Sequence, residues 1–291
     1  WIRYMTYKVK GTVVVDTSGN IVPGDKTKFV VNEGLNITTA PPNAYGEISG
    51  YTTAGFGPPH LNTIDKFPFA ADGNATDVGD LPRTTYYLAG QSSEVSGYAS
   101  GGQESGQYID KFPFAADGNA TNIGTLSQNR AFLAGQSSTE NGYSSGGNPA
   151  TNIIDKFPFA ADDNATDVGD LTSARPRVAG QSSDVSGYTS GGLTFNTIDK
   201  FPFASDANAT DVGDMTVSLG MHSGQSSDVY GYNASGYSPS FTSGSNVIDK
   251  FPFASDANAT DVGDLLSATL GTAGQSSAAS GYVAGGTPTG G

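Results

Sequence analysis

Ile64-Asp65-Lys66-Phe67-Pro68-Phe69 decides the fold of this chain, because the same stretch recurs four more times. The copies begin at Ile109, Ile154, Ile198 and Ile248, so successive starts lie 45, 45, 44 and 50 residues apart. A nearly constant period of this size is typical of proteins assembled from repeated supersecondary units, each of which buries its apolar faces against its neighbours. The sequence therefore predicts a repeat architecture.

The composition limits the fold class and the partners. The 291 residues include 40 glycines, and 14 basic against 28 acidic residues give a formal net charge of −14. Abundant Gly with Ser, Thr, Asn and Asp is typical of all-β proteins with many tight turns. Binding to phosphate groups depends on Lys and Arg, so we expect neither nucleic acid nor an anionic membrane surface as a partner.

The sequence shows no signal for secretion or membrane insertion. It contains no run of about 18 apolar residues, the length that a membrane-spanning helix needs. No apolar stretch follows the segment Trp1-Ile2-Arg3-Tyr4-Met5, so we expect no signal peptide. Cysteine is absent, which excludes disulfides and thiolate sites.

Each repeat predicts four short strands, as residues 173–215 illustrate. The expected strands, which we name a, b, c and d, span residues 177–183, 188–192, 197–203 and 210–215. Turn-forming residues separate a from b at 184–187, and c from d at 204–209. Four strands in about 45 residues is the size of one β-propeller blade.

The unit resembles a kelch-type blade. The resemblance is carried by strand a, by Gly187-Tyr188-x-x-Gly191-Gly192, and by an aromatic strand c followed by a short strand d. The glycine pair is the most specific part, whereas Val212-Gly213-Asp214 stands where the kelch pattern has a Trp. The resemblance implies a β-propeller of four-stranded blades.

The number of blades depends on how the two ends of the chain are used. Residues 1–40 precede the repeats and predict a β-hairpin segment, while the last repeat contains strands a and b alone. If the hairpin supplies strands c and d of that last blade, the ring closes and hides its edges. We therefore prefer six blades, with five blades plus a separate hairpin as the alternative and a trimeric fibre as a third arrangement. The repeats occupy 41–291, divided as 41–82, 83–127, 128–172, 173–215, 216–265 and a partial unit, 266–291.

The repeats of residues 41–286 also resemble uncharacterised virion-associated proteins of marine tailed bacteriophages. This resemblance implies a structural or adhesion protein of the virion, such as part of a tail fibre, made in the host cytoplasm. It implies other virion subunits as partners, with assembly into a homo-oligomer as a further expectation. It supplies no active site.

Differences between the repeats point to a binding face. The b–c and d–a connections vary between copies, whereas the a–b and c–d turns hardly change, and in a four-stranded blade the two variable sets leave on the same face. Loops on a rigid scaffold carry binding function, and aromatic and Arg side chains are the usual anchors. The alternative is that the sequences of these loops vary because nothing constrains them, and that Phe132 or Tyr87 simply packs onto strand a. The predicted ligand-binding residues are Tyr86, Tyr87, Arg130, Phe132, Arg175, Arg177, Phe195, Tyr237 and Phe241.

The conserved parts of the repeat have structural interpretations. Alternation along strand c places Phe67 and Phe69 on one face, where we expect them in the core between blades. We expect Lys66 and its counterparts to pair with carboxylates. In the c–d turn, Asp72, Asn74 and Asp77 offer oxygen ligands for a calcium ion. Asp and Asn also stabilise turns without any ion, which is the alternative.

No motif indicates catalysis or a cofactor. The only histidines are His60 and His222, and neither a Gly-x-Ser-x-Gly elbow nor a phosphate-binding loop is present. We therefore expect a non-enzymatic protein that binds a host-surface glycan or protein through its variable face. A capsid or tail decoration or connector protein without a host ligand is the alternative. A glycan hydrolase that uses paired Asp residues is the third hypothesis.

Overall fold

The computed structural model describes residues 8–9, 12–13, 49–104, 106–239 and 244–288. The chain divides into two compact units, residues 1–41 and 42–291. In the first unit, β1 (Lys8–Val9) and β2 (Thr12–Val13) form a two-stranded antiparallel sheet. The other N-terminal strands that the sequence predicts lie outside the described residues.

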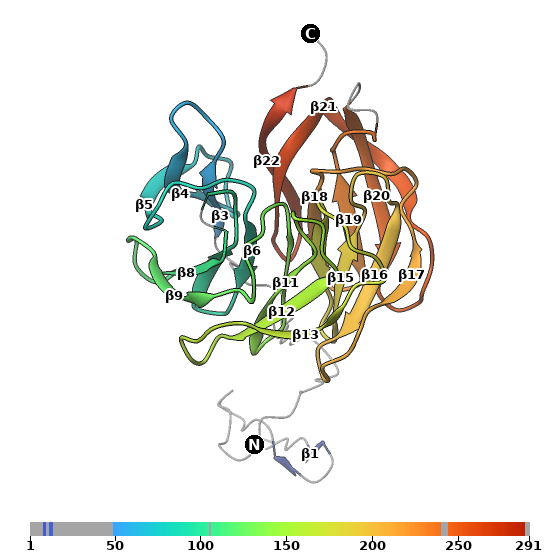
Figure 1. Ribbon diagram of the computed structural model, residues 1–291, viewed down its shortest axis with the longest axis horizontal. Helices are drawn as coiled ribbons and strands as arrows, with labels where there is room; N and C mark the ends of the chain where they lie inside the picture. Colours follow the sequence, from blue (N-terminus) through green and yellow to red (C-terminus); the bar gives the residue numbers. More distant parts are fainter. Residues whose placement is uncertain (1–7, 10–11, 14–48, 105, 240–243, 289–291) are drawn as a thin grey trace, which may run out of the picture. The chain divides into compact units, whose positions relative to one another are not determined.

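The second unit is a five-bladed β-propeller of small antiparallel sheets, and the described residues contain no helix. The sheets follow one another around a ring, from blue through green and yellow to red in Figure 1. The all-β prediction is thereby confirmed, and the four-stranded unit is found in the second, third and fourth blades, whereas the described residues give three strands in the first blade and five in the last. The first blade contains β3 (Ser49–Gly55), β4 (Leu61–Pro68) and β5 (Thr76–Asp80), and the second contains β6 (Ala89–Ser92), β7 (Ser96–Ser100), β8 (Tyr108–Pro113) and β9 (Thr121–Thr125). The third contains β10 (Ala134–Ser137), β11 (Asn141–Ser145), β12 (Ile153–Pro158) and β13 (Thr166–Asp170), and the fourth contains β14 (Ala179–Ser182), β15 (Ser186–Ser190), β16 (Thr197–Pro202) and β17 (Thr210–Asp214). The fifth contains β18 (Ser223–Ser226), β19 (Tyr230–Ala234), β20 (Ser245–Pro252), β21 (Thr260–Ser276) and β22 (Gly281–Pro288).

The blade count corrects the preferred prediction from six to five for the described residues. In the first four blades strand d ends and a connection leads to the next strand a, but β21 runs unbroken from Thr260 to Ser276. It therefore serves as strand d of the fifth blade and as strand a of the partial repeat, which joins the two in one sheet. Beyond β22 the described residues supply no strands c and d.

Aromatic residues of neighbouring blades form the core of the ring. The Tyr98 ring of strand b lies 5.6 Å from Phe157 and 4.8 Å from Phe159 of the next blade's strand c, measured between centroids. Phe67 and Phe69 contact Tyr282 of the partial repeat in the same manner, at 5.5 and 4.8 Å. The sequence prediction that these phenylalanines form the core between blades is confirmed.

The Gly-Tyr pair of strand b is explained by a close contact inside each blade. A Cβ atom on Gly97 would lie 2.3 Å from the ring of Phe112, which crosses over it from strand c. The same distance is found at Gly50, Gly142, Gly187 and Gly231 beneath their own phenylalanines. Glycine therefore provides the space into which the aromatic ring packs.

The Gly-Gln-Ser motif of strand a links successive blades by hydrogen bonds. Gln91 Nε2 donates to the backbone oxygen of Tyr143 at 2.9 Å, and Gln136 Nε2 donates to that of Tyr188 at 2.9 Å. Gln275 Nε2 donates to Tyr51 O at 3.3 Å, which connects the partial repeat to the first blade. Because buried polar groups need partners, these amides fix the order and spacing of the inner strands.

Lysines of strand c form a second set of links between blades. Lys66, Lys111, Lys156 and Lys200 each pair with an aspartate in the c–d turn of the following blade, with N–O distances between 2.5 and 3.0 Å. The expectation that these lysines pair with carboxylates is confirmed at four positions. The pairs are solvent-exposed, so each contributes at most about 1 kcal/mol to stability.

Candidate binding site

The variable b–c and d–a connections lie side by side, as the sequence predicts. Isolated backbone bridges join Tyr86 to Gln103, Ala131 to Asn148, and Gly220 to Tyr237. Each bridge connects the segment that enters a blade with the b–c loop of that same blade. Within each of these three blades the two variable connections are therefore adjacent.

One position in the d–a connection has an unusual backbone conformation in every copy. Tyr87, Phe132, Arg177 and Met221 have φ angles of 59°, 56°, 63° and 53°, and Gly271 at the same position has 70°. Side chains other than glycine rarely adopt this left-handed region, and bulky residues least of all. The chain thus carries four large side chains where glycine would be unstrained.

A continuous series of backbone hydrogen bonds holds these residues. Phe132 N donates to Tyr87 O at 2.8 Å, Arg177 N to Phe132 O at 2.8 Å, Met221 N to Arg177 O at 3.1 Å, and Gly271 N to Met221 O at 3.0 Å. Each bond joins one blade to the next, so the left-handed residues follow the ring. We call Tyr87, Phe132, Arg177 and Met221 the mouth residues.

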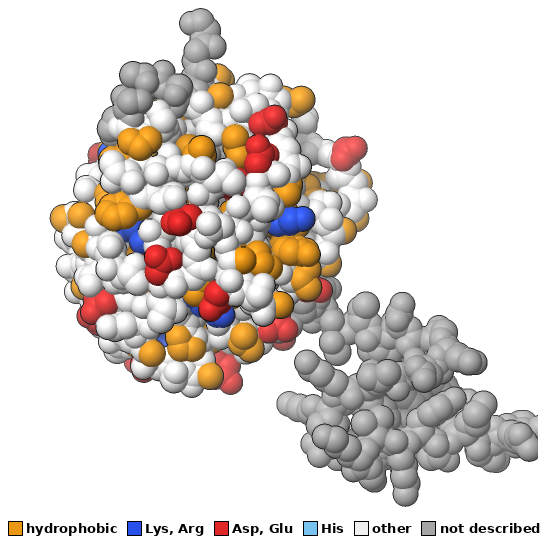
Figure 2. Space-filling view, turned by 90° about the vertical axis from the view of Figure 1, so that its right-hand side faces the viewer, with side chains coloured by type: hydrophobic (Ala, Val, Ile, Leu, Met, Phe, Trp, Pro, Cys, Tyr) orange, Lys and Arg blue, Asp and Glu red, His pale blue; other side chains and the backbone are white. Residues whose placement is uncertain are grey.

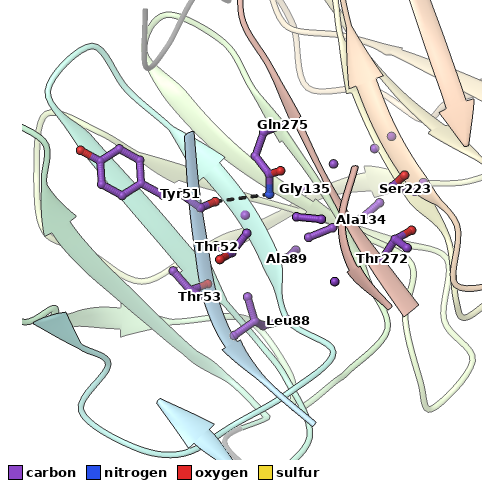
Figure 3. Close-up of a pocket in the computed structure, with 18 of the residues that line it drawn as sticks. Tyr51, Thr52, Thr53, Leu88, Ala89, Ala134, Gly135, Ser223, Thr272 and Gln275 are labelled. Atoms are coloured by element: carbon purple, nitrogen blue, oxygen red, sulfur yellow. Dashed lines mark hydrogen bonds between the residues drawn. The ribbon is translucent and has the colours of Figure 1, made fainter. Parts of the chain in front are cut away.

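The mouth residues line an open cavity of about 790 Å³ between the inner strands. Small residues form much of its wall, among them Ala89, Ala134, Gly135, Ser223 and Thr272, which lie around the same space in Figure 3. The Gln275–Tyr51 hydrogen bond crosses one side of this space (Figure 3).

An aromatic cluster surrounds two of the mouth residues. The ring of Tyr87 stacks on Phe132 with centroids 3.9 Å apart and lies 4.9 Å from Tyr86. Phe56, from the first b–c loop, lies 5.2 Å from Tyr86, and 68% of its surface is exposed. His60 lies 4.6 Å from Tyr86. These stacked and edge-on rings form an accessible aromatic surface beside the cavity.

Arg177 adds a positive charge to this cluster. Its guanidinium carbon lies 4.9 Å from the centroid of the Phe132 ring, within the range of a cation–π contact. Desolvation raises the pKa of the Tyr87 phenol above its ordinary value, while Arg177 acts in the opposite direction. Desolvation likewise raises the pKa of Tyr237, again opposed by Arg177. Both phenols are therefore neutral at pH 7.

The predicted residues Arg130 and Arg175 are not on the accessible surface. Both side chains are completely buried, and each pairs with an aspartate of strand c, Arg130 with Asp155 at 2.6 Å and Arg175 with Asp199 at 3.0 Å. Arg130 also donates to the backbone oxygens of Gly146 and Ser144. These arginines hold the d–a connection onto the blade, and we leave them out of the candidate site.

The remaining predicted residues are dispersed. Tyr237 is buried and bridged to the backbone of Gly220, and Phe195 is half-buried with its ring 5.9 Å from the Arg175 guanidinium carbon. Phe241 lies outside the described residues. The structure therefore brings together Tyr86, Tyr87, Phe132 and Arg177.

Sequence reasoning missed Phe56, His60 and Met221. Met221 occupies the same place in its repeat as Tyr87, Phe132 and Arg177, so a comparison of the copies position by position identifies it. Phe56 and His60 belong to a variable b–c loop, and no feature of the sequence shows that this loop reaches Tyr86.

The calcium candidates have structural partners in the other copies of the turn. Counterparts of Asp72 are the aspartates that pair with lysines, and counterparts of Asn74 accept a hydrogen bond from the preceding blade, as Asn119 does from Asp80 N at 3.0 Å. Asp77 accepts from Gly79 N in its own turn at 3.1 Å. Across the described part of the chain, no three His, Cys, Asp or Glu side chains cluster as a metal site would require.

The surface charge is distributed without one dominant patch on the side that Figure 2 shows. Carboxylates lie there as separate groups among uncharged and apolar side chains, and basic groups are few. Within the described ranges, no helix has the length and apolar character needed to cross a membrane.

Comparison with known proteins found no family model and no curated protein that matches this chain. The kelch and bacteriophage resemblances of the repeats therefore remain predictions from the sequence.

Proposed function

We propose that this protein is a non-enzymatic binding protein that takes a glycan or a protein segment at the mouth of the cavity. The observation that carries the proposal is the set of left-handed mouth residues, Tyr87, Phe132, Arg177 and Met221. Backbone strain in a non-glycine residue costs free energy and occurs preferentially at functional sites. Four such residues at one repeat position, all lining the same cavity, support a role in recognition.

The chemistry of the mouth favours a ligand with both apolar faces and polar edges. The Tyr86, Tyr87 and Phe132 rings offer flat apolar surfaces, and the tyrosine hydroxyls and the Arg177 guanidinium can hydrogen-bond hydroxyl or carbonyl groups. A pyranose ring has this character, since its C–H groups form an apolar face and its hydroxyls lie at the edge. We therefore favour a glycan over a protein segment.

The arrangement of carboxylates supports binding rather than hydrolysis. Glycoside hydrolysis normally uses two carboxyl groups on either side of the scissile bond. Asp65 is the single carboxylate among the described residues that line the cavity. We accordingly place the glycan hydrolase below the binding protein.

The biological setting of this proposal rests on the resemblance of the repeats alone. On that ground we propose a virion protein with other virion subunits as partners and host attachment as its role. Several copies in one particle would strengthen a weak single-site affinity through avidity. A decoration or connector protein without a host ligand is the alternative.

A binding experiment on the full chain tests the proposal. A glycan array identifies a ligand, and calorimetric titration then compares the parent with a Tyr87→Ala, Phe132→Ala double variant. We expect the dissociation constant to rise by about 30-fold or more, because each aromatic anchor contributes more than about 1 kcal/mol.

The matched control removes two exposed apolar side chains from the a–b turns, Val95→Ala and Val185→Ala, which are 66% and 68% exposed. This control should bind as the parent does. If the parent binds no glycan or cell surface, or if both double variants lose affinity equally, the mouth is not the binding site. The connector alternative would then be favoured.

A further inference from the structure

The two neighbours of Tyr87 that run parallel to it lie at very different distances. Tyr87 and Phe132 are in contact, with centroids 3.9 Å apart and planes inclined by 23°. Phe56 is also nearly parallel to Tyr87, at an interplanar angle of 10°, but its centroid lies 6.3 Å away. Because Phe132 covers one face of Tyr87, a ligand has the other face to stack on, and Phe56 is the parallel ring placed to cover that ligand.

Tyr86 closes one side of the space between Phe56 and Tyr87. Its ring stands at 67° to Phe56 and at 73° to Tyr87, with centroids 5.2 and 4.9 Å away. His60 lies 4.6 Å from Tyr86 and 5.3 Å from Phe56, and its Nε2 atom is 3.7 Å from Oε1 of Glu104. The space therefore has two apolar walls and an edge where phenol, imidazole and carboxylate groups can form hydrogen bonds.

The stereochemistry of a sugar determines whether it fits between two apolar walls. In a pyranose whose ring substituents are all equatorial, both faces carry axial C–H groups and the hydroxyls lie at the edge. One axial hydroxyl makes one face polar, and an aromatic ring packed against that face leaves the hydroxyl without a hydrogen-bond partner. Two walls therefore reject an epimer that a single wall accepts on its apolar face.

We propose that Phe56 and Tyr87 hold one pyranose ring between them, so that the site selects sugars of the gluco configuration, whose ring substituents are all equatorial. This inference rests on the proposed function, because it names the kind of glycan that the mouth takes. Two carbon contacts of about 3.5–4.0 Å need about 7–8 Å between the walls, so Phe56 moves outward as the sugar enters. Phe56 is 68% exposed in the loop between β3 and β4, which leaves it room to move.

A quaternary ammonium ion is another ligand that aromatic walls of this kind accommodate. The position of Arg177 disfavours it, since the guanidinium carbon lies 4.9 Å from the centroid of the Phe132 ring. The charge of Arg177 also reaches Tyr87, where it opposes the rise in pKa that desolvation causes. A cation between Phe56 and Tyr87 would be repelled by this like charge, whereas a neutral sugar would not.

Three methyl glycosides test the selectivity on the full chain. Methyl β-glucoside has the all-equatorial ring, while the β-galactoside and the β-mannoside each have one axial hydroxyl, at C4 and at C2. We expect calorimetric titration to give a dissociation constant about tenfold or more lower for the glucoside. Equal or tighter binding of either epimer, or tighter binding of choline, overturns the proposal. If an epimer binds through Tyr87 and Phe132, the proposed function stands without this selectivity, and if no glycan binds at all, both are wrong.

Variants of Phe56 show whether the second wall causes the preference. Phe56→Ala removes that wall, so we expect glucoside binding to weaken by about tenfold and the ratio of glucoside to galactoside affinity to fall toward one. Phe56→Tyr keeps the wall and should keep both values. The matched control, Leu61→Ala, removes a 43% exposed side chain where the same loop ends at β4, and it should also leave both unchanged. A Phe56→Ala variant that retains the preference overturns the proposal.

Discussion

The mouth residues offer a stability test at the scale of one side chain. Tyr87 has a φ of 59°, a region that costs L-residues with a Cβ about 1 kcal/mol or more. Both Tyr87→Ala and Tyr87→Gly remove the ring, but glycine alone also relieves the backbone strain. We therefore expect the glycine variant to be about 1 kcal/mol more stable than the alanine variant in urea unfolding.

Leu88, the next residue, is the control, because it has no left-handed backbone. There the order should reverse, with Leu88→Gly less stable than Leu88→Ala owing to the greater freedom of glycine in the unfolded chain. If both positions give the same order, the strain at Tyr87 is absent in solution.

His222 predicts a pH dependence at the same scale. It is buried, and desolvation together with the Arg175 charge lowers its pKa to about 4. The unfolded chain, with an ordinary pKa near 6.5, binds the proton more strongly, so stability falls as pH falls from about 6.5 toward 4. Between pH 7 and pH 5 the loss should be about 2 kcal/mol.

The repeat itself supplies the variant that tests this. Leu88 and Leu133 occupy the equivalent place in other copies, so His222→Leu should fold normally. Between pH 7 and pH 5, the free energy of unfolding of this variant should change by about 2 kcal/mol less than that of the parent. An unchanged pH profile in urea titrations would show that another group causes the dependence.

At the scale of the element, the buried arginines distinguish two ways of holding a d–a connection. Asp155 forms an ion pair with Arg130 and accepts a hydrogen bond from the backbone N–H of Ser127. Asp199 forms an ion pair with Arg175 and accepts hydrogen bonds from both the backbone N–H and the hydroxyl of Thr172. Among the described residues of the fifth blade, Thr216 is the one donor to Asp249 in this role, and Leu219 stands at the arginine position.

Arg130→Leu should therefore destabilise the protein more than Arg175→Leu. The first change leaves a buried carboxylate with one donor, which costs about 3–5 kcal/mol. The second leaves the Asp–Thr arrangement that the fifth blade already uses, and we expect less than half of that loss. Thermal and urea unfolding of the two variants decides the order, and equal losses would contradict the role of Thr172.

The elements were largely predictable, and the reason lies in the repetition. Within residues 173–215 the expected strands a, c and d overlap β14, β16 and β17, while β15 starts two residues earlier than expected, at Ser186. The glycine pair that the sequence places at the end of strand b follows β15 with φ angles of 64° and 115°, so it belongs to the turn.

The candidate site was predictable only in part. Variation among the copies pointed to the b–c and d–a connections, and the proposed candidate site lies in these connections. Variation by itself did not separate Arg130, which points into its blade, from Arg177, which lies at the cavity. A comparison of the copies position by position does separate them, because Arg177 shares its place with Gly271, and a glycine there indicates a left-handed backbone.

At the scale of the whole molecule, the number of blades depends on where the partial repeat is placed. The five identical strands c predict five sheets, but from the sequence the partial repeat could either extend the fifth sheet or begin another. The unbroken β21 joins it to the fifth sheet, since the Leu265-Leu266-Ser267 segment continues as extended strand. In the earlier repeats, residues such as Arg130 fold this connection inward.

The five copies of Ile-Asp-Lys-Phe-Pro-Phe also have a consequence for how the chain folds. Any strand b can form nearly the same side-chain contacts with the strand c of a different repeat, so the search for partners contains many wrong solutions of similar energy. Short b–c loops favour the local partner, because closing a small loop loses the least entropy. The longest of these loops lies between β19 and β20, in the repeat where the start-to-start spacing is 50 residues. Misassembly during synthesis should concentrate there, as is characteristic of repeat proteins.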